Sequence, residues 1–429
     1  MEKQKALLGS AFAKINLDLR IGPLREDGYH ETNSWMHRVG LCDFLSLNFA
    51  DKEEKLYAHA AVKEQLDAAK VPWDGKAVAL ADEAERLRPI FSVVAAQGLL
   101  KAAYDWPEGF YAARLSLSIN AHIQLRVSLI STVGALDLNE KNTMIKAFRY
   151  FFEDPKASSE TSKNEHFHHS ERREQIYDLC CLKCIPMQAG LGGGSADAAA
   201  VFHLLKQSDP SRATLSHEPM KQVGADVPFC YASYSAHCRG LGEKLTPYPR
   251  LTGLPLLIVK PPESASTERL FLALDQKRSS ATKAERAQAW TQASLAHERF
   301  HLALRFWYDS WMKLNGSAFL HANQVQRRNG RHEASLTTEA SCSKALDEAS
   351  QTMKEAGIND FYREVFAKEA PLKFCYEALA HSGADYFNLT GSGSAFFAIY
   401  RSDSELFLAQ AYLKAKLGPK AFVYKTTLL

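Results

Sequence analysis

Apolar and polar residues alternate with a period of two through most of the first fifty residues. The segments AKINLDLRIG (13–22) and GLCDFLSLNFA (40–50) show this pattern, and REDGYH (25–30) between them has the composition of a turn. Because successive side chains of a strand point to opposite faces, the alternation predicts two strands joined by a turn. Similar patterns predict strands in residues 113–130, 176–185 and 254–262, and two more around a glycine turn in YFNLTGSGSAFFAIY (386–400).

Helical spacing of apolar residues is found in other parts of the chain. It covers residues 142–152, 195–206 and most of 277–350, and residues 52–111 also have an alanine-rich, helical character. Proline and glycine gather at residues 246–254, which indicates a domain boundary there. The sequence therefore predicts strands and helices in more than one domain.

Composition limits the kinds of protein that this chain can be. It has 429 residues, of which 46% are hydrophobic and 24% charged, as in globular proteins of two or three domains. The net charge of +3 is too small to favour nucleic acid or a membrane surface as a partner. No apolar run is long enough for a membrane span, and the first residues do not resemble a signal peptide. We expect a cytoplasmic protein; a plastid form that has lost its transit peptide stays open.

Neither the cysteines nor the histidines form a convincing metal motif. Cys181 and Cys184 make one CxxC pair without a second pair at suitable spacing, so buried free thiols are the favoured interpretation. The tract HFHHS contains His166, His168 and His169 in a polar segment, where such tracts are usually incidental. We therefore predict no metal ligand among these side chains.

The stretch MQAGLGGGSADAA combines bare backbone with the start of a helix. It follows the predicted strand at Ile185 and Pro186. Glycines allow positive φ angles, and N–H groups at a helix N-terminus bind phosphate. Ser195 could cap the helix or bind a phosphate-bound Mg²⁺ through its hydroxyl group. A Walker A loop is excluded because no lysine follows Gly194, and a dinucleotide fingerprint because residue 195 is serine. A tight turn for close helix–strand packing stays open.

Two charged residues stand in apolar surroundings. Asp226 in GADVPFC could be partly desolvated and act as a base, although it could equally be an aspartate at a turn or helix end. Lys14 interrupts the first strand. If it points inward it needs a carboxylate or a phosphate as partner, whereas on an edge strand it would face water.

These motifs together resemble the GHMP kinases. AKINLDL followed by DGYH, GLGGGSAD, GADVPF and LTGSGSAFF stand in the order found in that superfamily. CLKCIPM, GLGEKLTP, KPPESASTERLF and the NDF at 359–361 match as well, so the resemblance covers roughly 250 to 280 residues. DGYH and the GGGS form of the loop point to the branch that phosphorylates a sugar alcohol joined to cytidine diphosphate in isoprenoid precursor synthesis.

The resemblance implies an α+β fold with the two-domain GHMP kinase architecture. The N-terminal domain, residues 1–245, would resemble the second domain of ribosomal protein S5 and bind ATP. The C-terminal domain, residues 246–429, would be ferredoxin-like. ATP and substrate would lie in the cleft between the domains.

The resemblance also assigns roles to individual residues. Lys14 and Asp226 correspond to the catalytic pair: Asp226 would take the proton from the substrate hydroxyl, and Lys14 would hold it ionised. ATP with Mg²⁺ is the implied cofactor, and the implied substrate is a small molecule with a cytidine diphosphate group. Residues expected to bind substrate are Asn16, Tyr29, His30, Thr267 and Phe271. Residues expected to bind ATP are Pro186, Gly190, Leu191, Gly192, Gly193, Gly194 and Ser195, with Gly391 and Gly393 as a supporting motif.

The chain departs from the family pattern in several places. It is longer than expected, with predicted surface insertions at about 52–111, 157–173 and 277–350. Gln188 stands where a small residue or glycine is expected, and Ala196 where a second serine is expected. Two alternatives therefore stay open: a GHMP kinase that acts on another small alcohol, and a non-catalytic nucleotide-binding regulator with the same fold.

Overall fold

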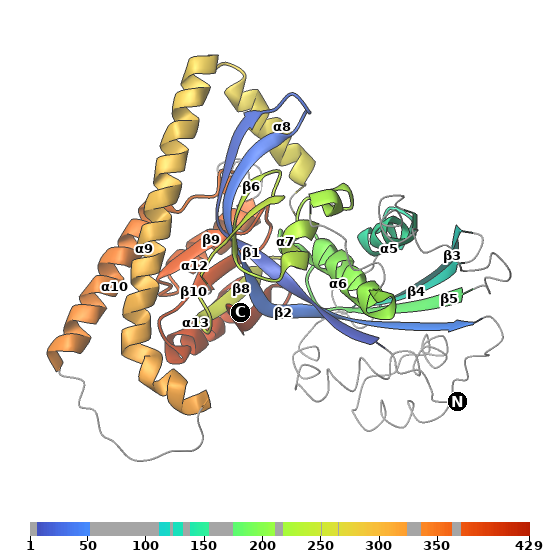
Figure 1. Ribbon diagram of the computed structural model, residues 1–429. Coiled ribbons are helices and arrows are strands. Elements are labelled where there is room, and N and C mark those ends of the chain that lie inside the picture. The colour runs from blue at the N-terminus through green and yellow to red at the C-terminus, as the bar shows by residue number, and fades with distance from the viewer. Residues whose placement is uncertain are drawn as a thin grey trace. The chain divides into compact units, whose positions relative to one another are not determined.

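The structure is a computed structural model, drawn as a ribbon in Figure 1. It describes residues 7–51, 111–120, 123–131, 138–153, 175–210, 218–249, 251–264, 266–323, 336–362 and 370–429. The insertion predicted at 157–173, with its histidine tract, lies outside these residues, as does nearly all of the one at 52–111. Within the described parts of the chain, no helix combines the length and the apolar character that a membrane crossing requires.

The described chain contains both strands and helices. The strands are β1 (Leu7–Leu24), β2 (His30–Asp51), β3 (Tyr111–Asn120), β4 (Ile123–Ser131), β5 (Gln175–Lys183), β6 (Ala236–Gly240), β7 (Lys244–Pro247), β8 (Pro255–Lys260), β9 (Tyr386–Leu389), β10 (Phe396–Ile399) and β11 (Phe422–Thr427). The helices are α5 (Thr143–Glu153), α6 (Gly193–Ser208), α7 (Val227–Ala232), α8 (Thr267–Arg278), α9 (Lys283–Asn323), α10 (Leu336–Ala356), α12 (Ala370–Ala380) and α13 (Asp403–Leu417), with a short 3-10 helix, η2 (Glu218–Gln222).

The chain forms two compact units, each made of several segments. Unit 1 contains residues 1–13, 41–187 and 192–233, and unit 2 contains residues 14–40, 188–191 and 234–429. The long strands β1 and β2 contribute residues to both units. Because the units are discontinuous in sequence, the predicted division after residue 245 stays a prediction.

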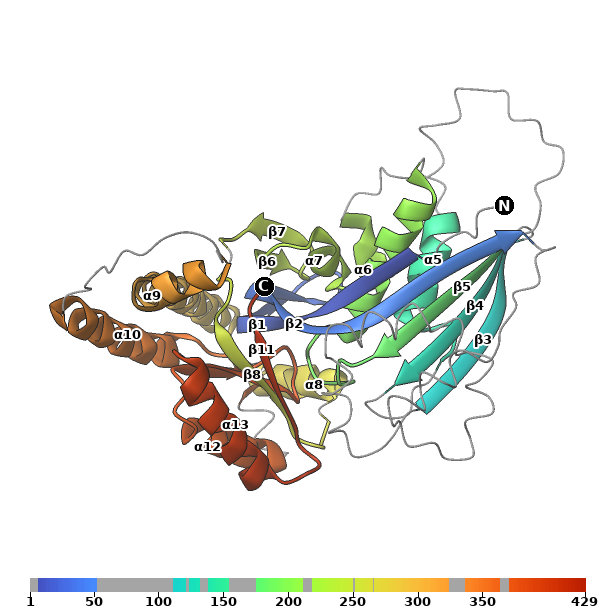
Figure 2. The same ribbon diagram turned by 90° about the horizontal axis from the view of Figure 1, so that it is seen from below.

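Unit 1 is built on a sheet with strand order β3–β4–β5–β2. β3 and β4 form an antiparallel hairpin, β4 runs parallel to β5, and β5 pairs antiparallel with residues 44–51 of β2. Figures 1 and 2 show α5 and α6 on one face of these strands. The helix α5 buries Ile145, Phe148 and Phe151, and α6 buries a run of alanines between Ala196 and Ala200. Small side chains let α6 pack closely on its neighbours.

Unit 2 contains a four-stranded sheet with the order β11–β8–β10–β9, all antiparallel. Residues 32–36 of β2 pair with β6, and β6 with β7. The main core of the unit joins the last part of β1 to the sheet and to α8, α12 and α13, through residues such as Leu19, Leu257, Leu270, Leu379 and Leu413.

The segment 277–350 is not confined to the surface, which corrects the expectation of a surface insertion. It forms most of α9 and α10, which pack side by side in Figure 1. His297, Phe300 and Trp307 of α9 are buried almost completely. One face of this helix therefore belongs to the interior of unit 2.

Candidate active site

The predicted catalytic lysine lies inside unit 2 and does not face water. Lys14 is 3% exposed, and its ammonium group donates to Oδ1 of Asn16 at 2.6 Å. Its backbone N–H donates to the carbonyl oxygen of Leu191 in the glycine loop at 2.9 Å. The alternative of an edge-strand lysine in water is therefore wrong, and Lys14, Asn16 and Leu191 come together in unit 2.

Thr390 joins the lysine strand to the glycine loop. Its hydroxyl oxygen accepts from the backbone N–H of Asn16 at 3.1 Å and donates to the carbonyl oxygen of Gly190 at 3.2 Å. Thr390 was not among the predicted site residues. The signal that could have found it is its position directly before Gly391 in LTGSGSAFF.

The third glycine motif supports the loop by close approach. A β-carbon on Gly391 would lie 3.0 Å from the carbonyl oxygen of Gly190 and 3.4 Å from Nζ of Lys14. Gly391 and Gly393 both have positive φ angles, of 57° and 81°. The amide of Asn359, buried next to this turn, donates to the carbonyl oxygens of Leu389 and Gly391 at 2.8 and 2.7 Å. Asn359 is a further residue that the sequence reasoning did not assign to the site.

The helix after the loop begins earlier than predicted. Its N-cap residue is Gly192, which has φ 68° and makes no side-chain cap hydrogen bond. Ser195 is therefore the third residue of α6, and its predicted role as the cap is wrong. A β-carbon on Gly193 would lie 3.1 Å from the side chain of Ile185, so close helix–strand packing explains this glycine without any ligand.

The two departures in the loop have structural explanations. Gln188 has φ 50°, a left-handed conformation that glycine adopts without strain, which explains why glycine is expected there. The side chain of Gln188 is exposed, so it does not crowd the loop. Ala196 is 2% exposed and packs in the core. A serine there would have to find a buried hydrogen-bond partner.

Asp226 lies at the start of a helix in unit 1. It is the N-cap residue of α7, it is half-buried, and its side chain makes no cap hydrogen bond. A β-carbon on Gly224, two residues earlier, would lie 3.5 Å from the hydroxyl oxygen of Ser195. Unit 1 therefore brings the turn that carries Asp226 next to the first turn of α6, while Lys14 belongs to unit 2.

A buried charge cluster supports α6 in unit 1. The ammonium group of Lys183 at the end of β5 bonds to both Asp43 and Asp197, the latter at 2.5 Å, and all three are buried. Asp43 also accepts the backbone N–H of Ile185 at 2.7 Å. Burial raises the pKa of Asp197 well above its usual range, and nearby Asp43 raises it further, although the Lys183 charge opposes both. For Lys183, burial lowers the pKa, but the two carboxyl groups outweigh it and raise the pKa.

The residues predicted to hold the cytosine ring lie at the β1–β2 turn and on α8. Tyr29 is 62% exposed, whereas His30 is buried and stacks on Phe271 with ring centroids 5.3 Å apart. Nδ1 of His30 faces the carbonyl oxygen of Gly22, and Nε2 lies 3.0 Å from a carboxylate oxygen of Asp275. His30 and Phe271 thus come together, and Tyr29 offers a free face beside them.

Thr267 is the first residue of α8 and connects this helix to the third glycine motif. Its hydroxyl group shares a hydrogen bond with that of Ser392 at 2.7 Å, and both belong to unit 2. Ser392 lies between Gly391 and Gly393. The predicted substrate-binding helix and the predicted supporting motif are therefore in contact.

Metal-binding side chains do not gather in the described ranges. No group of three or more His, Cys, Asp or Glu residues there could hold an ion. All eight cysteines are free; Cys181 is buried with its sulfur 4.0 Å from Asp197, and Cys184 is half-buried. Burial, with the nearby charge of Asp197, raises the pKa of the Cys181 thiol well above its usual range.

Comparison with known proteins gives partial matches in sequence. The chain is 42% identical over 93 residues to a 4-diphosphocytidyl-2-C-methyl-D-erythritol kinase of Clostridium botulinum, a match that covers 21% of this chain and 32% of that protein. It is 46% identical over 100 residues to the same kinase of Rhodopseudomonas palustris, covering 22% and 32%. The chain thus spans about a third of the length of the curated relatives that it matches. No protein-family model matches.

Comparison of structures covers nearly the whole chain. A crystal structure of 4-(cytidine 5'-diphospho)-2C-methyl-D-erythritol kinase aligns over 98% of this chain and 99% of its own, with a TM-score of 0.50 and 17% identity. This likeness shows the fold, and it confirms the predicted α+β architecture. The chain therefore has the fold of the GHMP kinases, and part of it resembles 4-diphosphocytidyl-2-C-methyl-D-erythritol kinase in sequence.

Proposed function

We propose that this protein phosphorylates the 2-hydroxyl group of 4-diphosphocytidyl-2-C-methyl-D-erythritol with ATP, in the synthesis of isoprenoid precursors. One observation carries the proposal: the buried ammonium group of Lys14 is held by Asn16, while the backbone of Lys14 is bonded to the glycine loop. A buried cation beside a loop of this kind suits an anionic phosphate ligand. The names of the partly matching relatives support the same substrate.

The proposed reaction is a direct transfer. The substrate hydroxyl oxygen attacks the γ-phosphorus of ATP and forms a new P–O bond, the bond to the β-phosphate oxygen breaks, and ADP leaves. The proton of the hydroxyl group passes to the carboxylate of Asp226. Such transfers depend mainly on positioning and on charge stabilisation. Lys14 would supply positive charge near the transferred group.

ATP would be bound by the loop between β5 and α6. The backbone N–H groups at the N-terminus of α6 are available to phosphate because Gly192 provides no side-chain cap. The hydroxyl group of Ser195, in the first turn of α6, is an oxygen donor of the kind that Mg²⁺ accepts. When bound with ATP, Mg²⁺ would neutralise phosphate charge.

Cytosine would bind at the β1–β2 turn. The exposed ring of Tyr29 offers a stacking face. His30 and Phe271 lie too close to each other to admit a third ring between them, so the base would stack against Tyr29 and the free part of Phe271. Nε2 of His30, now next to Asp275, would face the base edge, and Thr267 would fix the start of α8. We propose a cytoplasmic enzyme without a nucleic acid or membrane partner.

The test is phosphate transfer from ATP with Mg²⁺ to 4-diphosphocytidyl-2-C-methyl-D-erythritol. Asp226→Asn should lower kcat by about 10²- to 10⁴-fold, as expected for loss of a general base, while Asp209→Asn at the C-terminus of α6 serves as a control of equal charge change. Tyr29→Ala should raise KM for the substrate and leave KM for ATP unchanged, and Tyr29→Phe should restore it.

Other outcomes separate the alternatives. Turnover that is unaffected by Tyr29→Ala, together with activity on a small alcohol that lacks cytidine, would favour a GHMP kinase with a different acceptor. A folded wild-type protein that binds ATP and transfers no phosphate to any such acceptor would favour a regulator.

A further inference from the structure

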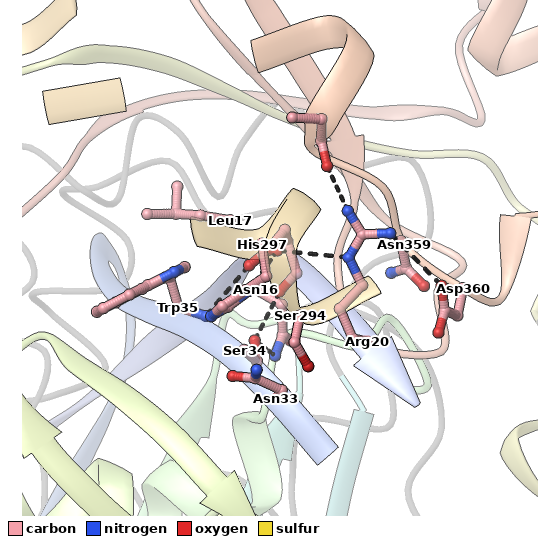
Figure 3. Close-up of polar contacts among 12 residues, drawn as sticks. Asn16, Leu17, Arg20, Asn33, Ser34, Trp35, Ser294, His297, Asn359 and Asp360 are labelled. Carbon is pink, nitrogen blue, oxygen red and sulfur yellow. Dashed lines mark hydrogen bonds and ion pairs between the residues drawn. The ribbon is translucent and has the colours of Figure 1, made fainter. Parts of the chain in front are cut away.

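An aspartate is completely buried in β1, four residues after Lys14. Asp18 has no exposed surface, and its carboxylate accepts a hydrogen bond from Nδ1 of His297 at 2.6 Å (Figure 3). The backbone N–H of Trp35 donates to the other carboxylate oxygen of Asp18 at 3.3 Å. Nε of Arg20 lies 3.7 Å from the oxygen that His297 contacts. A buried carboxylate needs such partners, because an unpaired one is costly.

A continuous line of hydrogen bonds runs from this aspartate to Lys14. The hydroxyl group of Ser34 donates to the backbone carbonyl oxygen of Asp18 at 2.7 Å. The amide nitrogen of Asn16 donates to the Ser34 oxygen at 2.8 Å, and the amide oxygen of Asn16 accepts from the Lys14 ammonium group at 2.6 Å. Each of these side chains is at most 3% exposed, and all belong to unit 2.

The direction of each bond in this line is determined. An ammonium group has only donors, so it must meet the oxygen of the Asn16 amide, and the amide nitrogen must then point to Ser34. The Ser34 oxygen accepts this bond, and the Ser34 hydroxyl group donates its single hydrogen to the backbone carbonyl oxygen of Asp18. Asn16 can therefore hold Lys14 only while Ser34 and the backbone at Asp18 stay in place.

The imidazole that holds Asp18 comes from α9, a helix within the segment that exceeds the expected family length. His297 is 1% exposed, and it is fixed on its far side as well. Its Nε2 lies 3.2 Å from Nε2 of His237, which in turn lies 2.5 Å from the amide oxygen of Asn33. The ring of Trp35 stacks on His237 and His297 with centroids 4.2 and 5.3 Å apart. The imidazole is thus held on two edges and one face.

We propose that His297 is a positioning residue for the phosphoryl transfer: its Nδ1–H fixes Asp18, and Asp18, through Ser34 and Asn16, fixes the ammonium group of Lys14. The expected effect of His297 on the rate of phosphoryl transfer rests on the proposed function. This role of His297 also gives α9 a part in positioning Lys14, because this helix supplies the shortest of the bonds that hold the Asp18 carboxylate. A displacement of the Lys14 ammonium group by a fraction of an ångström would lower the rate of transfer.

Two amide variants test this role. The side-chain nitrogen of asparagine stands close to the place of histidine Nδ1, and that of glutamine close to the place of Nε2. His297→Gln should therefore lose the bond to Asp18 and lower kcat by about tenfold or more, with KM for ATP unchanged. His297→Asn keeps a donor facing Asp18 and should remain close to wild type. His301→Gln is the matched control, because His301 lies one turn further along α9 and stacks on Trp35 at 4.3 Å.

A second measurement does not depend on activity. The ¹⁵Nζ resonance of the Lys14 ammonium group should shift in His297→Gln and in Asp18→Asn, and stay unchanged in His297→Asn and His301→Gln. Equal rates and resonances in the Gln and Asn variants would overturn the proposal. Loss of folding in both would overturn it too, because the role of His297 would then be structural. An inactive wild type whose Lys14 resonance responds as stated would refute the proposed kinase function and keep the line to Lys14.

Discussion

The carbonyl oxygen of Thr390 lies 2.0 Å from the point where a β-carbon on Gly190 would stand. No real β-carbon approaches a backbone oxygen so closely, so the two chain segments can meet only if residue 190 is glycine. Its φ angle of 73° adds a second reason, because other residues adopt this conformation with strain. The glycine loop and the third glycine motif are therefore fitted to each other.

Gly190→Ala tests this fit against a matched control. Gly28 has a similar φ angle of 80°, but a β-carbon there would meet nothing within 4 Å. We expect Gly190→Ala to lower the free energy of unfolding by about 4 kcal/mol and Gly28→Ala by about 1 to 2 kcal/mol, since both are strained and only the first is crowded. Urea unfolding of the two variants gives the comparison. Equal losses would mean that the loop moves away from Thr390 at little cost.

Thr390→Val should weaken the link between Asn16 and the loop. The substitution keeps the shape of the side chain and removes the hydroxyl group that bonds to Asn16 and Gly190. Leaving buried polar groups without this partner should cost about 1 to 3 kcal/mol in unfolding free energy. Thr390→Ser keeps the hydroxyl group and should cost less. The idea would be refuted by a serine variant that is less stable than the valine variant.

Asp43 and Asp197 both bond to Lys183, but replacing each with asparagine should change the free energy of unfolding by different amounts. Burial raises the pKa of Asp197 well above its usual range, so the fold stabilises the charged form of this carboxyl group poorly. Asp197→Asn should therefore change the unfolding free energy by less than about 1 kcal/mol. Asp43→Asn should cost about 3 to 5 kcal/mol, because Asp43 bonds to the buried Lys183 ammonium group and also accepts the backbone N–H groups of Cys184 and Ile185. Denaturant unfolding at neutral pH measures both, and a larger loss for Asp197→Asn would reverse the assignment.

The histidines around Trp35 predict a pH dependence of stability. Burial lowers the pKa of His237 from 6.5 to about 4, with further lowering by the nearby His297 and Arg239 charges. Burial lowers the pKa of His301 as well. Between about pH 6.5 and pH 4 the unfolded chain binds a proton on His237 that the folded chain does not. The contribution of this group is thus fully present above the unfolded pKa and is lost as the pH falls through this window.

His237→Gln checks the sign of this effect. The variant should show a shallower fall in unfolding free energy between about pH 6.5 and pH 4 than the wild type. A wild-type curve that is flat or rises toward acid, or a variant with the same slope, would show that His237 does not titrate as stated. The surface-exposed His381, which follows the end of α12, is a suitable control for replacement.

Most elements could be predicted because their patterns are local. The two strands around DGYH, the helix α5, the strand β5 and the strand–turn–strand at the third glycine motif all form where the alternation or helical spacing indicates. The apolar period alone fixes these elements. The strand β2 begins at His30, ten residues before the predicted start. Residues 30–39 are mostly polar in sequence, and residues 32–36 become strand by pairing with β6, far along the chain.

Only some residues of the site could be predicted from the sequence, and those that were missed were missed for different reasons. Lys14 and the glycines carry recognisable motifs. Thr390 and Asn359 also stand in quoted motifs, but their roles come from hydrogen bonds to backbone groups elsewhere, among them carbonyl oxygens 200 and 32 residues away. No spacing rule marks such partners. Ser195 was misassigned as a possible cap because serine is a favoured N-cap residue, while the structure uses Gly192 in the left-handed conformation. The buried face of α9 was missed because polar residues such as His297 obscure its apolar pattern.

The four residues 188–191 of the glycine loop belong to unit 2, although the residues on both sides of them belong to unit 1. The chain changes unit five times, at residues 13, 40, 187, 191 and 233. No single cut of the gene can therefore yield either unit as one continuous fragment. Local unfolding of either unit would therefore change the conformation of one part of this loop, and the loop can keep its shape only while both units are folded.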